Sequence, residues 1–449
     1  MKKKFIISED GFTLSSILML ILLATTLLFG FITLLTFYNS YNIKLTNKKT
    51  LDLACFSALQ ILLNNENELE EKVTVVKIDS VTVKLVKSAN GVFTEIESTA
   101  IGFNDSSKIK YLIANKIEPP FNNAVVISKD RLRAAVAGKT SITGNMLLTT
   151  DKVKIGRITG VSSASKDYLD GELKINENIE TKLLDERILL SIFKYFEINE
   201  NANYISNNFD LNATTITKLS SNRINVIEGD LYIRGNIRNN KKSEKCFISV
   251  KGQTTIEENS IVNKDMQITS DSSIIVEENV NLGDIILATE NKIEVGENTY
   301  GKNVQLFAKK GVSISGSLFE YPTVIGLYTD SDEESNFKNK LEISSSIING
   351  SILLVCSTVG LPKNKSIITI DDQSKVHGLI YSENNADISG YVNGIIYTYS
   401  FWYYKEPTEY INWLVNVNVD SKKLDTEFLL PVGFKGINEM AILKETWTN

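Results

Sequence analysis

A long stretch without charge, from Gly11 to Phe37, constrains this chain more than any other feature. It reads GFTLSSILMLILLATTLLFGFITLLTF, and the next charged residue is Lys44. As a helix rising 1.5 Å per residue, Phe12 to Phe37 would be about 39 Å long, whereas the hydrocarbon of a bilayer is about 30 Å thick. A secretory signal has a shorter apolar core, of about 7–15 residues, followed by small residues at the cleavage site. The stretch therefore predicts a single membrane span, from Leu14 to Phe37, that stays with the protein.

The residues before and within this stretch carry a family resemblance. Lys2–Lys4, followed by Gly11–Leu14 and the apolar run, resemble the N-terminus of a type IV prepilin or pseudopilin. The resemblance implies that a prepilin peptidase removes a leader, residues 1–11, by cutting between Gly11 and Phe12, and that Phe12 is then N-methylated. It also implies that the helix anchors the subunit in the lipid bilayer and later packs against other pilin-like subunits in a filament. It covers residues 1–50 and nothing beyond them.

One position departs from the family pattern. Most family members have glutamate at the fifth residue after the cut, where its carboxylate offsets the N-terminal charge of a neighbouring subunit. This chain has Ser16 there, and a serine hydroxyl cannot take that role. Subunits without the glutamate are typically minor ones, including those at a filament tip, so the resemblance implies a minor pilin. The alternative is an uncleaved signal anchor that holds a membrane-tethered scaffold and enters no filament.

The charge of the chain limits which partners it can have and bears on the orientation of the span in the membrane. The net charge of −6 argues against a nucleic-acid partner, which would need a basic face. The lysines that flank the span are nearly balanced and orient it only weakly: Lys2, Lys3 and Lys4 precede it, and Lys44, Lys48 and Lys49 follow it. The size of the C-terminal part and the resemblance favour a single-pass protein with a short cytoplasmic N-terminus and a periplasmic or extracellular bulk.

Two regions precede the repeats. We expect the helix, residues 12–70, to continue beyond the membrane with an apolar stripe that needs a partner: Leu45, Leu51, Cys55, Leu59, Leu62 and Leu69. In residues 71–136 apolar and polar side chains alternate as they do in strands, and Ser88–Gly91 has the composition of a hairpin turn. We expect a small antiparallel sheet there, interrupted at Pro119 and Pro120.

A fixed period near twenty residues dominates the rest of the chain. Two columns of apolar residues recur, the first at spacings of 20, 19 and 19 and the second at 19 throughout: Ile256, Val276, Val295 and Ile314, then Ile268, Leu287, Leu306 and Ile325. Such a period, with β-branched residues and Asn or Gly corners, is typical of a β-solenoid (parallel β-helix). Each coil of a solenoid lies about 4.8 Å above the last. The predicted fold class is therefore mainly β.

The repeat also suggests boundaries. We expect first coils at 137–165, a partly helical insertion at 166–221 with its helix over 183–198, and the main solenoid at 222–404. The first column continues at Ile343, Ile370 and Ile388, and the extra residues at 330–340 and 360–365 are expected to form loops at one corner. An open terminal coil would offer unpaired backbone groups to other chains, so we expect residues 405–449 to cap or flank the solenoid.

Two local patterns resemble chemical sites but have simpler interpretations. Gly138-Lys139-Thr140 resembles the end of a phosphate-binding loop, which needs glycine five positions before Gly138. Arg133 stands there, so we predict a coil corner. His377 is the one histidine, which excludes a two-histidine metal site, and a Ser-His-Asp triad would have to use it. No nucleophile-elbow sequence is present, so we predict a solenoid turn beside Gly378.

Acidic and sulfur side chains give no clear metal or disulfide site. The cluster Asp330, Asp332, Glu333 and Glu334 lacks the spacing of a calcium loop, so we predict a solvated loop. Cys246 and Cys356 should lie about 20 Å apart along the stack, too far for a disulfide, and are expected to be free, small apolar residues in the columns. Cys55 could pair only between chains. We expect no cofactor and no metal.

A third hypothesis is a polysaccharide-active β-helix enzyme. Such enzymes group Asp, Arg and Lys on one face, but arginine occurs within residues 222–400 only at 223, 234 and 238, so this hypothesis is the least favoured. A run of aromatic residues could stack on a surface polysaccharide, although strand alternation would turn part of it into packing: Tyr397, Tyr399, Phe401, Trp402, Tyr403 and Tyr404. The sequence thus favours an exported structural or adhesive protein over an enzyme.

Overall fold

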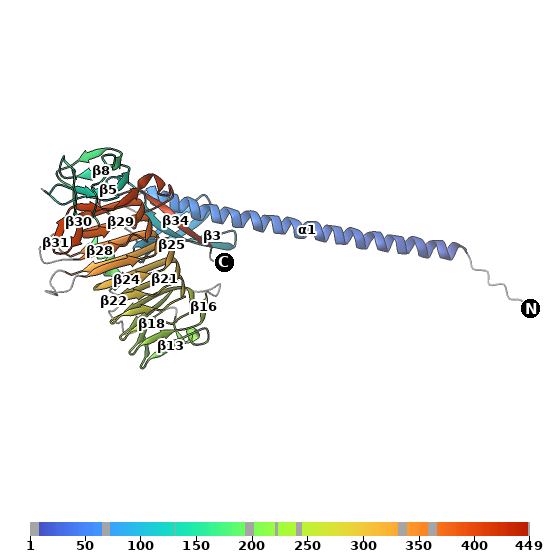
Figure 1. The fold of residues 1–449 in the computed structure, drawn as a ribbon. Coiled ribbons are helices and arrows are strands. Elements are labelled where there is room, and N and C mark those ends of the chain that lie inside the picture. The colour runs from blue at the N-terminus through green and yellow to red at the C-terminus, as the bar shows by residue number, and fades with distance from the viewer. Residues whose placement is uncertain are drawn as a thin grey trace, which may run out of the picture. The chain divides into compact units, whose positions relative to one another are not determined.

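The computed structural model of this protein describes residues 9–64, 72–130, 132–193, 202–220, 223–238, 245–330, 339–357 and 366–447. Its fold is mainly β, with a long N-terminal apolar helix, a small antiparallel sheet, a large parallel sheet wound about an axis and a short helical insert (Figure 1). This confirms the predicted fold class. The chain divides into two compact units, the first made of Met1–Lys87, Ile96–Lys110 and Thr446–Asn449, and the second of Ser88–Glu95 and Tyr111–Glu445.

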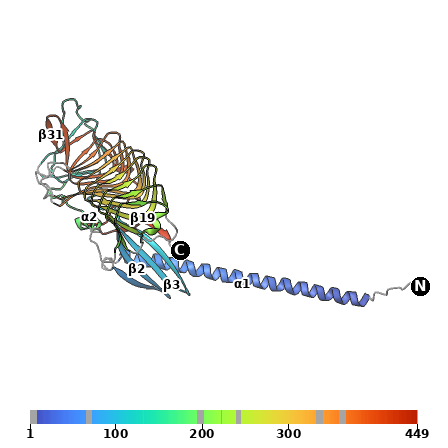
Figure 2. The same ribbon diagram turned by 90° about the horizontal axis from the view of Figure 1, so that it is seen from below.

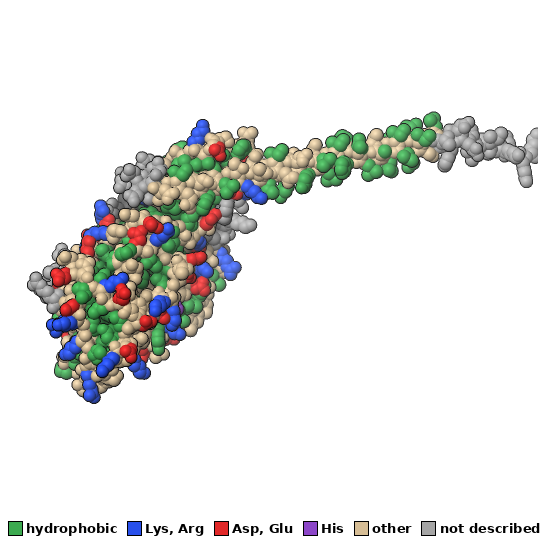
Figure 3. Space-filling model, turned by 90° about the horizontal axis from the view of Figure 1, so that it is seen from above, with side chains coloured by type: hydrophobic (Ala, Val, Ile, Leu, Met, Phe, Trp, Pro, Cys, Tyr) green, Lys and Arg blue, Asp and Glu red, His purple; other side chains and the backbone are tan. Residues whose placement is uncertain are grey.

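The first unit begins with a single helix, α1 (Glu9–Asn64), which is 56 residues long. Every side chain from Leu14 to Phe37 is exposed, and Figure 3 shows apolar side chains all along this part of the helix. Nearer its C-terminal end, a stripe of residues three and four apart is buried: Leu51, Ala54, Cys55, Ala58, Leu59 and Leu62. The predicted stripe is therefore confirmed at Leu51, Cys55, Leu59 and Leu62. It is wrong at Leu45, which is 42% exposed, and Leu69 lies outside the described residues.

An antiparallel sheet packs on the buried stripe. Its strands are ordered β1 (Val73–Ile78), β2 (Val81–Asn90), β3 (Phe93–Gly102), β4 (Asp105–Asn115) and β34 (Met440–Trp447). Polar bonds join it to α1: the Ser98 hydroxyl on β3 donates to the Cys55 carbonyl at 3.3 Å, and the Ser107 hydroxyl on β4 donates to the Asp52 carboxylate at 2.5 Å. The predicted small antiparallel sheet is thus confirmed.

The second unit is a solenoid of stacked coils (Figure 2), in which the strands of one coil pair in parallel with those of the next. In one coil, β18 (Thr254–Ile256) leads through a corner at Asn259, with φ 60°, into β19 (Ile261–Ser270). The pairing of β19 shifts between Asn263 and Met266, so this strand supplies two faces of the coil. Asn279 and Asn298 repeat the corner with φ 58° and 56°, a left-handed conformation that asparagine tolerates better than most residues.

The strands of the second unit follow one another in short pieces. They are β5 (Val125–Ile127), β6 (Ala135–Ala137), β7 (Ser141–Thr143), β8 (Met146–Leu148), β9 (Lys154–Ile155), β10 (Leu169–Asp170), β11 (Leu173–Ile175), β12 (Asn203–Ile205), β13 (Phe209–Leu211), β14 (Ile224–Ile227), β15 (Leu231–Ile233), β16 (Asn236–Arg238), β17 (Cys246–Val250), β18, β19, β20 (Ile274–Val276), β21 (Asn281–Thr289), β22 (Lys292–Val295), β23 (Tyr300–Ala308), β24 (Gly311–Ser315), β25 (Leu318–Thr329), β26 (Lys340–Ser344), β27 (Ile347–Cys356), β28 (Ile367–Ile370), β29 (Lys375–Ile388), β30 (Tyr391–Lys405), β31 (Thr408–Ile411), β32 (Trp413–Val415) and β33 (Asn418–Asp420).

Backbone pairing confirms both predicted apolar columns. Each residue of a column is the direct partner of the next, and all of them are buried. The first column is Ile256, Val276, Val295, Ile314, Ile343, Ile370 and Ile388. The second is Ile268, Leu287, Leu306 and Ile325, and it continues through Ile352, Ile380 and Ile396. Stacking at the strand spacing gives each column continuous dispersion contact along the solenoid axis.

The coils do not stack in chain order. β30 pairs with β5, β32 with β6 and β33 with β7, so the coils of residues 125–175 lie on the C-terminal coil. The sequence suggested instead that coils at 137–165 precede the others and that residues 405–449 cap or flank the end of the solenoid. In the structure the solenoid begins at β5, and β32 and β33 complete a coil. A sequence repeat identifies the coils but not which coil stacks on which. The backbone hydrogen bonds between parallel strands are the same for any pair of coils.

After β11 the chain runs along the outer face of the coils. This return segment, residues 176–193, ends in α2 (Glu186–Phe193), which confirms a helix in the predicted insertion (Figure 2); residues 194–198 of the predicted helix lie outside the described ones. A second hydrophobic core forms beneath it. That core joins the return segment and residues 428–437 to outward-facing solenoid side chains: Leu183, Leu184, Leu189, Ile192, Phe193, Phe428, Leu430, Phe434, Ile286, Phe307, Tyr381 and Tyr397.

Candidate functional sites

The apolar part of α1 is the first candidate site. Within the described residues, one helix is long and apolar enough to cross a membrane, and it lies near the N-terminus. Its threonine hydroxyls can lie in an apolar environment because each already donates a hydrogen bond to a carbonyl one turn earlier in the helix. The pairs are Thr25 to Ile21, Thr26 to Leu22, Thr33 to Phe29 and Thr36 to Ile32, at 2.7–3.0 Å. The helix is thus consistent with a membrane anchor or a signal sequence.

The processing site expected at Gly11 and Phe12 remains a prediction. Both residues belong to the helical backbone of α1, which begins at Glu9, but their side chains lie outside the described part. Ser16, where the family pattern has glutamate, is exposed.

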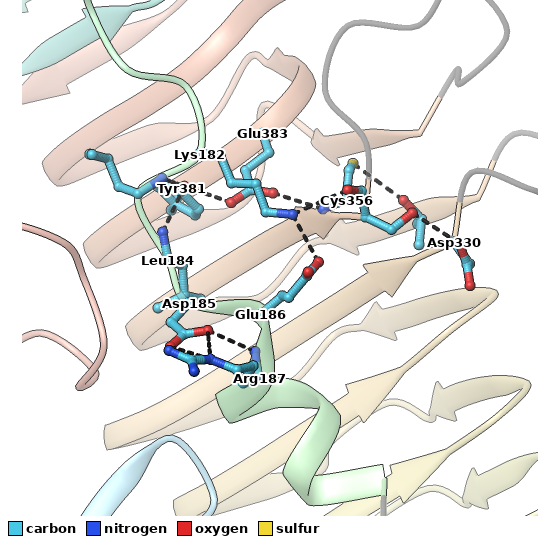
Figure 4. Close-up of polar contacts among 12 residues, drawn as sticks. Lys182, Leu184, Asp185, Glu186, Arg187, Asp330, Cys356, Tyr381 and Glu383 are labelled. Carbon is cyan, nitrogen blue, oxygen red and sulfur yellow. Dashed lines mark hydrogen bonds and ion pairs between the residues drawn. The ribbon is translucent and has the colours of Figure 1, made fainter. Parts of the chain in front are cut away.

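A buried polar cluster on β29 is the second candidate site (Figure 4). Glu383 is fully buried. Its Oε2 accepts the backbone N–H of Cys356 at 2.9 Å, and its Oε1 lies 2.8 Å from the hydroxyl of Tyr381. We call Tyr381, Glu383 and the backbone they bind the Glu383 cluster. It lies where the return segment crosses β27 and β29, so it joins segments that are far apart in sequence.

Tyr381 ties the return segment to the solenoid. Its hydroxyl oxygen accepts the backbone N–H groups of Leu183 at 2.8 Å and Leu184 at 3.2 Å, and it lies 3.1 Å from the carbonyl oxygen of Thr181. The neighbouring Tyr397 hydroxyl donates to the carbonyl of Glu180. A tyrosine therefore presents a polar tip to the backbone while its ring fills the second core.

Charged groups surround the cluster on its outer side. Lys182 bridges to Glu186 at 2.8 Å and donates to the Ser357 carbonyl at 3.2 Å. The side chain of Ser357 donates to Asp330 at 2.9 Å (Figure 4). Lys182 therefore lies near the surface among carboxylates, next to the buried carboxyl of Glu383.

Burial dominates the ionisation of the cluster. It raises the pKa of Glu383 to about 7 and that of the Cys356 thiol to about 12. Burial, followed by the charge of Glu383, raises the pKa of Tyr381 well above its ordinary value. Such shifts are typical of both active sites and buried structural networks. Since Glu383 and Cys356 are both 0% exposed, the cluster offers no surface to a substrate, and its geometry serves to fasten the return segment.

A groove beside His377 is the third candidate site. Its volume is about 1040 Å³, and its walls come from Lys116, Tyr321, Asn349, His377 and the residues around Phe428 and Ile442. The amide nitrogen of Asn393 lies 3.1 Å from Nδ1 of His377. Burial, followed by the charge of Lys375, lowers the pKa of His377, so its ring is neutral at pH 7. Lys423, Asp425 and Glu427 also line the groove, so its wall carries basic and acidic side chains beside apolar ones.

The predicted position of His377 needs a correction. His377 lies within β29, in register with Asn349 and Asn393, and not in a turn. Among the described residues its side-chain partner is Asn393, so the structure does not assemble a Ser-His-Asp triad. In contrast, the predicted corner at Gly138 is confirmed: Gly138 has φ 69°, and the Thr140 hydroxyl donates back to the Ala137 carbonyl at 2.7 Å.

All three cysteines are free and buried. This confirms the prediction for Cys246 and Cys356, which both belong to the solenoid core. Cys55 was expected to be able to pair between chains. The structure contradicts this, because Cys55 is 0% exposed and its thiol faces the carbonyls of Ser98 and Ser107 at 3.6 and 3.7 Å.

The remaining charged and aromatic candidates are described only in part. Of the acidic cluster at 330–334, Asp330 is described and the others lie outside the described residues. The part of the chain that the structure describes holds no group of three or more His, Cys, Asp or Glu side chains suited to a metal. Arg234 pairs with Asp210 at 2.9 Å and Glu257 at 3.3 Å.

The aromatic run 397–404 is buried only in part, and Tyr399, Trp402 and Tyr403 in it are half-buried. Tyr397 and Phe401 are buried, whereas Tyr404 is 49% exposed. Trp402 stacks on Tyr404 with 6.0 Å between ring centroids.

Comparison of the chain with family models, with curated proteins and with solved structures gives no match. The sites above therefore rest on the geometry alone. Sequence reasoning missed the Glu383 cluster. The signal that could have revealed it is the polar run Ser382–Asn385, which stands between the column residues Ile380 and Ile388.

Proposed function

We propose that this protein is a membrane-anchored, exported structural protein, similar to a minor type IV pilin-like subunit, whose β-solenoid serves as a spacer or adhesive surface. Its N-terminus would be cytoplasmic and its bulk periplasmic or extracellular. Partners would be the lipid bilayer, other pilin-like subunits and a prepilin peptidase, with a surface polysaccharide as a further ligand of the solenoid.

The two halves of α1 carry this proposal. The half from Leu14 to Phe37 is exposed on every side, whereas the stripe from Leu51 to Leu62 is buried under a sheet of the same unit. An exposed apolar surface of this size needs lipid or other helices around it. One continuous helix can therefore be held by its own unit at one end and by a membrane or a filament core at the other.

Two tyrosines support a position for the end of the span at the membrane surface. Tyr38 and Tyr41, 62% and 58% exposed, follow the apolar run directly, and Lys44 follows them. Tyrosine favours the membrane–water interface because its ring is apolar and its hydroxyl polar. This order supports an interface near residues 38–41, with the lysines in water.

A non-catalytic role is supported by the Glu383 cluster, by His377 and by the charge of the surface. The Glu383 cluster is closed to solvent, His377 has an amide partner, and positive and negative side chains are interspersed over the face that Figure 3 shows. The last point also supports the absence of a nucleic-acid partner. The groove beside His377 has basic and acidic side chains in its wall, Lys116, Lys423, Asp425 and Glu427, and a polysaccharide-active enzyme, the least favoured alternative, would have to act there.

The mature N-terminus tests the proposal. We expect mass spectrometry of protein from its native host to find a chain that begins at methylated Phe12, and expect Gly11→Val to block this processing while the protein still reaches the membrane. A chain that begins at Met1 would contradict the pilin-like role. It would favour the alternative, an uncleaved solenoid scaffold tethered by the same helix.

A further inference from the structure

We propose that the groove beside His377 binds a neutral chain of N-acetylated amino sugars. The inference deepens the proposed function, on which it rests for the export that would bring such a glycan to the solenoid. Every residue that lines the groove belongs to the second unit, so one unit supplies the whole site.

Three consecutive coils supply the floor of the groove. Tyr321 comes from β25, Asn349 from β27 and His377 from β29. Asn349 and His377 are direct partners in the parallel pairing of β27 and β29. Since each coil lies about 4.8 Å from the next, the floor extends along the solenoid axis for about 10 Å. A floor of this form suits a ligand whose units repeat in one direction.

The floor offers hydrogen-bonding groups that the protein leaves unused. The amide nitrogen of Asn393 lies 3.1 Å from Nδ1 of His377. An amide nitrogen only donates, so Nδ1 accepts and the proton of the neutral ring is on Nε2. Within the described part of the chain, neither Nε2 of His377 nor the side-chain amide of Asn349 has a hydrogen-bond partner. An acetamido group, with one N–H and one carbonyl, is the complement of such an amide.

Aromatic rings line the groove next to these polar groups. The ring centroids of Tyr321 and Phe428 are 5.3 Å apart. The Tyr321 hydroxyl is engaged with the backbone of Leu429, whose N–H it accepts at 2.9 Å. Tyr321 therefore contributes its ring, and not its hydroxyl, to the groove. Aromatic rings pack against apolar C–H groups, which a pyranose ring and an acetyl methyl group both provide.

The charges of the groove disfavour an acidic sugar. Both lysines of its wall are held in ion pairs with carboxylates that do not line it. The pairs are Lys116 with Glu439 at 2.9 Å and Lys423 with Asp420 at 3.1 Å. Asp425 and Glu427 are exposed on the wall, and no other described residue forms an ion pair with either of them. A uronic acid would be repelled by these two carboxylates, so the wall favours a neutral chain.

An extended peptide is the competing class of ligand. β27 pairs with β25 and β29, and β29 pairs with β27 and β30. A peptide that binds as an added strand needs an open strand edge, which these two floor strands do not offer. The geometry of the floor therefore favours a glycan over a peptide.

Calorimetric titration of the full chain, in micelles of a detergent without a sugar headgroup, measures this binding. The probes are triacetylchitotriose, cellotriose (the same chain with hydroxyls in place of the acetamido groups), trigalacturonic acid and an end-capped tetra-alanine peptide. We expect triacetylchitotriose to bind about tenfold more tightly than cellotriose, because cellotriose lacks the group that pairs with Asn349. The acidic sugar and the peptide should bind more weakly than triacetylchitotriose by at least the same factor.

A pair of variants tests the role of the amide. Asn349→Leu removes the amide at nearly constant volume, and we expect it to lower the affinity for triacetylchitotriose about tenfold and to abolish the preference over cellotriose. The matched control is Asn263→Leu, at an exposed asparagine of β19 that does not line the groove. This variant should leave both affinities unchanged.

Saturation-transfer NMR of the unmodified protein gives a second readout that needs no variant to fold. We expect the acetyl methyl protons to receive more saturation than the sugar ring protons. The inference is wrong if triacetylchitotriose does not bind, if cellotriose or the peptide binds as tightly, or if Asn349→Leu and Asn263→Leu behave alike. These outcomes do not depend on the mature N-terminus: a chain that begins at Met1 would contradict the pilin-like role and leave binding in the groove unchanged.

Discussion

At the scale of single residues, the cysteine thiols show how burial governs reactivity. Cys55, Cys246 and Cys356 are at most 3% exposed. Burial raises the pKa of Cys246 to about 11 and that of Cys356 to about 12, and it also raises the pKa of Cys55. The thiolate is the reactive form, so these side chains combine a small reactive fraction with no path for a reagent.

We therefore expect all three thiols to resist labelling in the native protein. At pH 8 an aromatic disulfide reagent should react at least about 100-fold more slowly than in guanidinium chloride, where the pKa returns to about 8.5. The measurement is the absorbance of the released thiolate, with three equivalents expected after denaturation. Rapid release of one equivalent from the folded chain would mean that a thiol placed in the core is accessible.

The same residues show how far the sequence could predict side-chain environments. The repeat predicted that Cys246 and Cys356 lie on the solenoid. It also predicted that they are too far apart to form a disulfide, because the number of coils between two residues gives their distance along the solenoid axis. Cys55 was misjudged because the stripe on α1 shows which face needs a partner but not that a sheet of the same unit supplies it. Glu383 was missed because the period of apolar residues identifies only the side chains that point into the solenoid interior. The carboxyl of Glu383 is buried on another side of its strand.

At the scale of elements, α1 combines two environments in one helix. Leu59 is 0% exposed under the antiparallel sheet, whereas Leu53, less than two turns away, is 66% exposed. The same apolar side chain therefore contributes to packing at one position and not at the other. These two leucines form a matched pair for measuring how firmly the sheet holds the helix.

We expect Leu59→Ala to destabilise the packing of α1 on the sheet by about 2–5 kcal/mol, since it removes buried methyl groups and leaves a cavity. Leu53→Ala should change it by less than about 0.5 kcal/mol. Hydrogen exchange of residues 51–62 in the full chain measures the difference. Equal effects of the two changes would show that the stripe is not held by the sheet.

Elements with a strong period were predictable, and those without one were not. The two columns were identified residue by residue because parallel coils repeat the same inward position. The helix in the return segment was found from its amphipathic pattern. Strands β5, β6, β32 and β33 were not assigned to the solenoid, because three-residue strands between irregular loops carry too few residues to show a period.

At the scale of the whole second unit, the order of the coils is the feature that a repeat cannot reveal. Ser141 on β7 is the direct partner of Asn418 on β33. Asn236 occupies the same column, nine coil steps away, at about 4.8 Å per step or about 43 Å in total. Stacking in chain order would instead bring the coils of residues 125–175 close to β16.

Engineered disulfides distinguish the two orders. We expect Ser141→Cys with Asn418→Cys to form an intramolecular disulfide, because neighbouring strands bring Cα atoms within the range of about 4.4–6.8 Å that the bond needs. Ser141→Cys with Asn236→Cys should remain reduced under the same oxidation. Mass spectrometry of the linked peptides after proteolysis measures both. Since all three positions lie on one solenoid face and the native cysteines are buried, the two variants differ only in coil order. A bond in the second variant and not in the first would show that the N-terminal coils stack next to β16 and that the chain does not close back on its C-terminal coil.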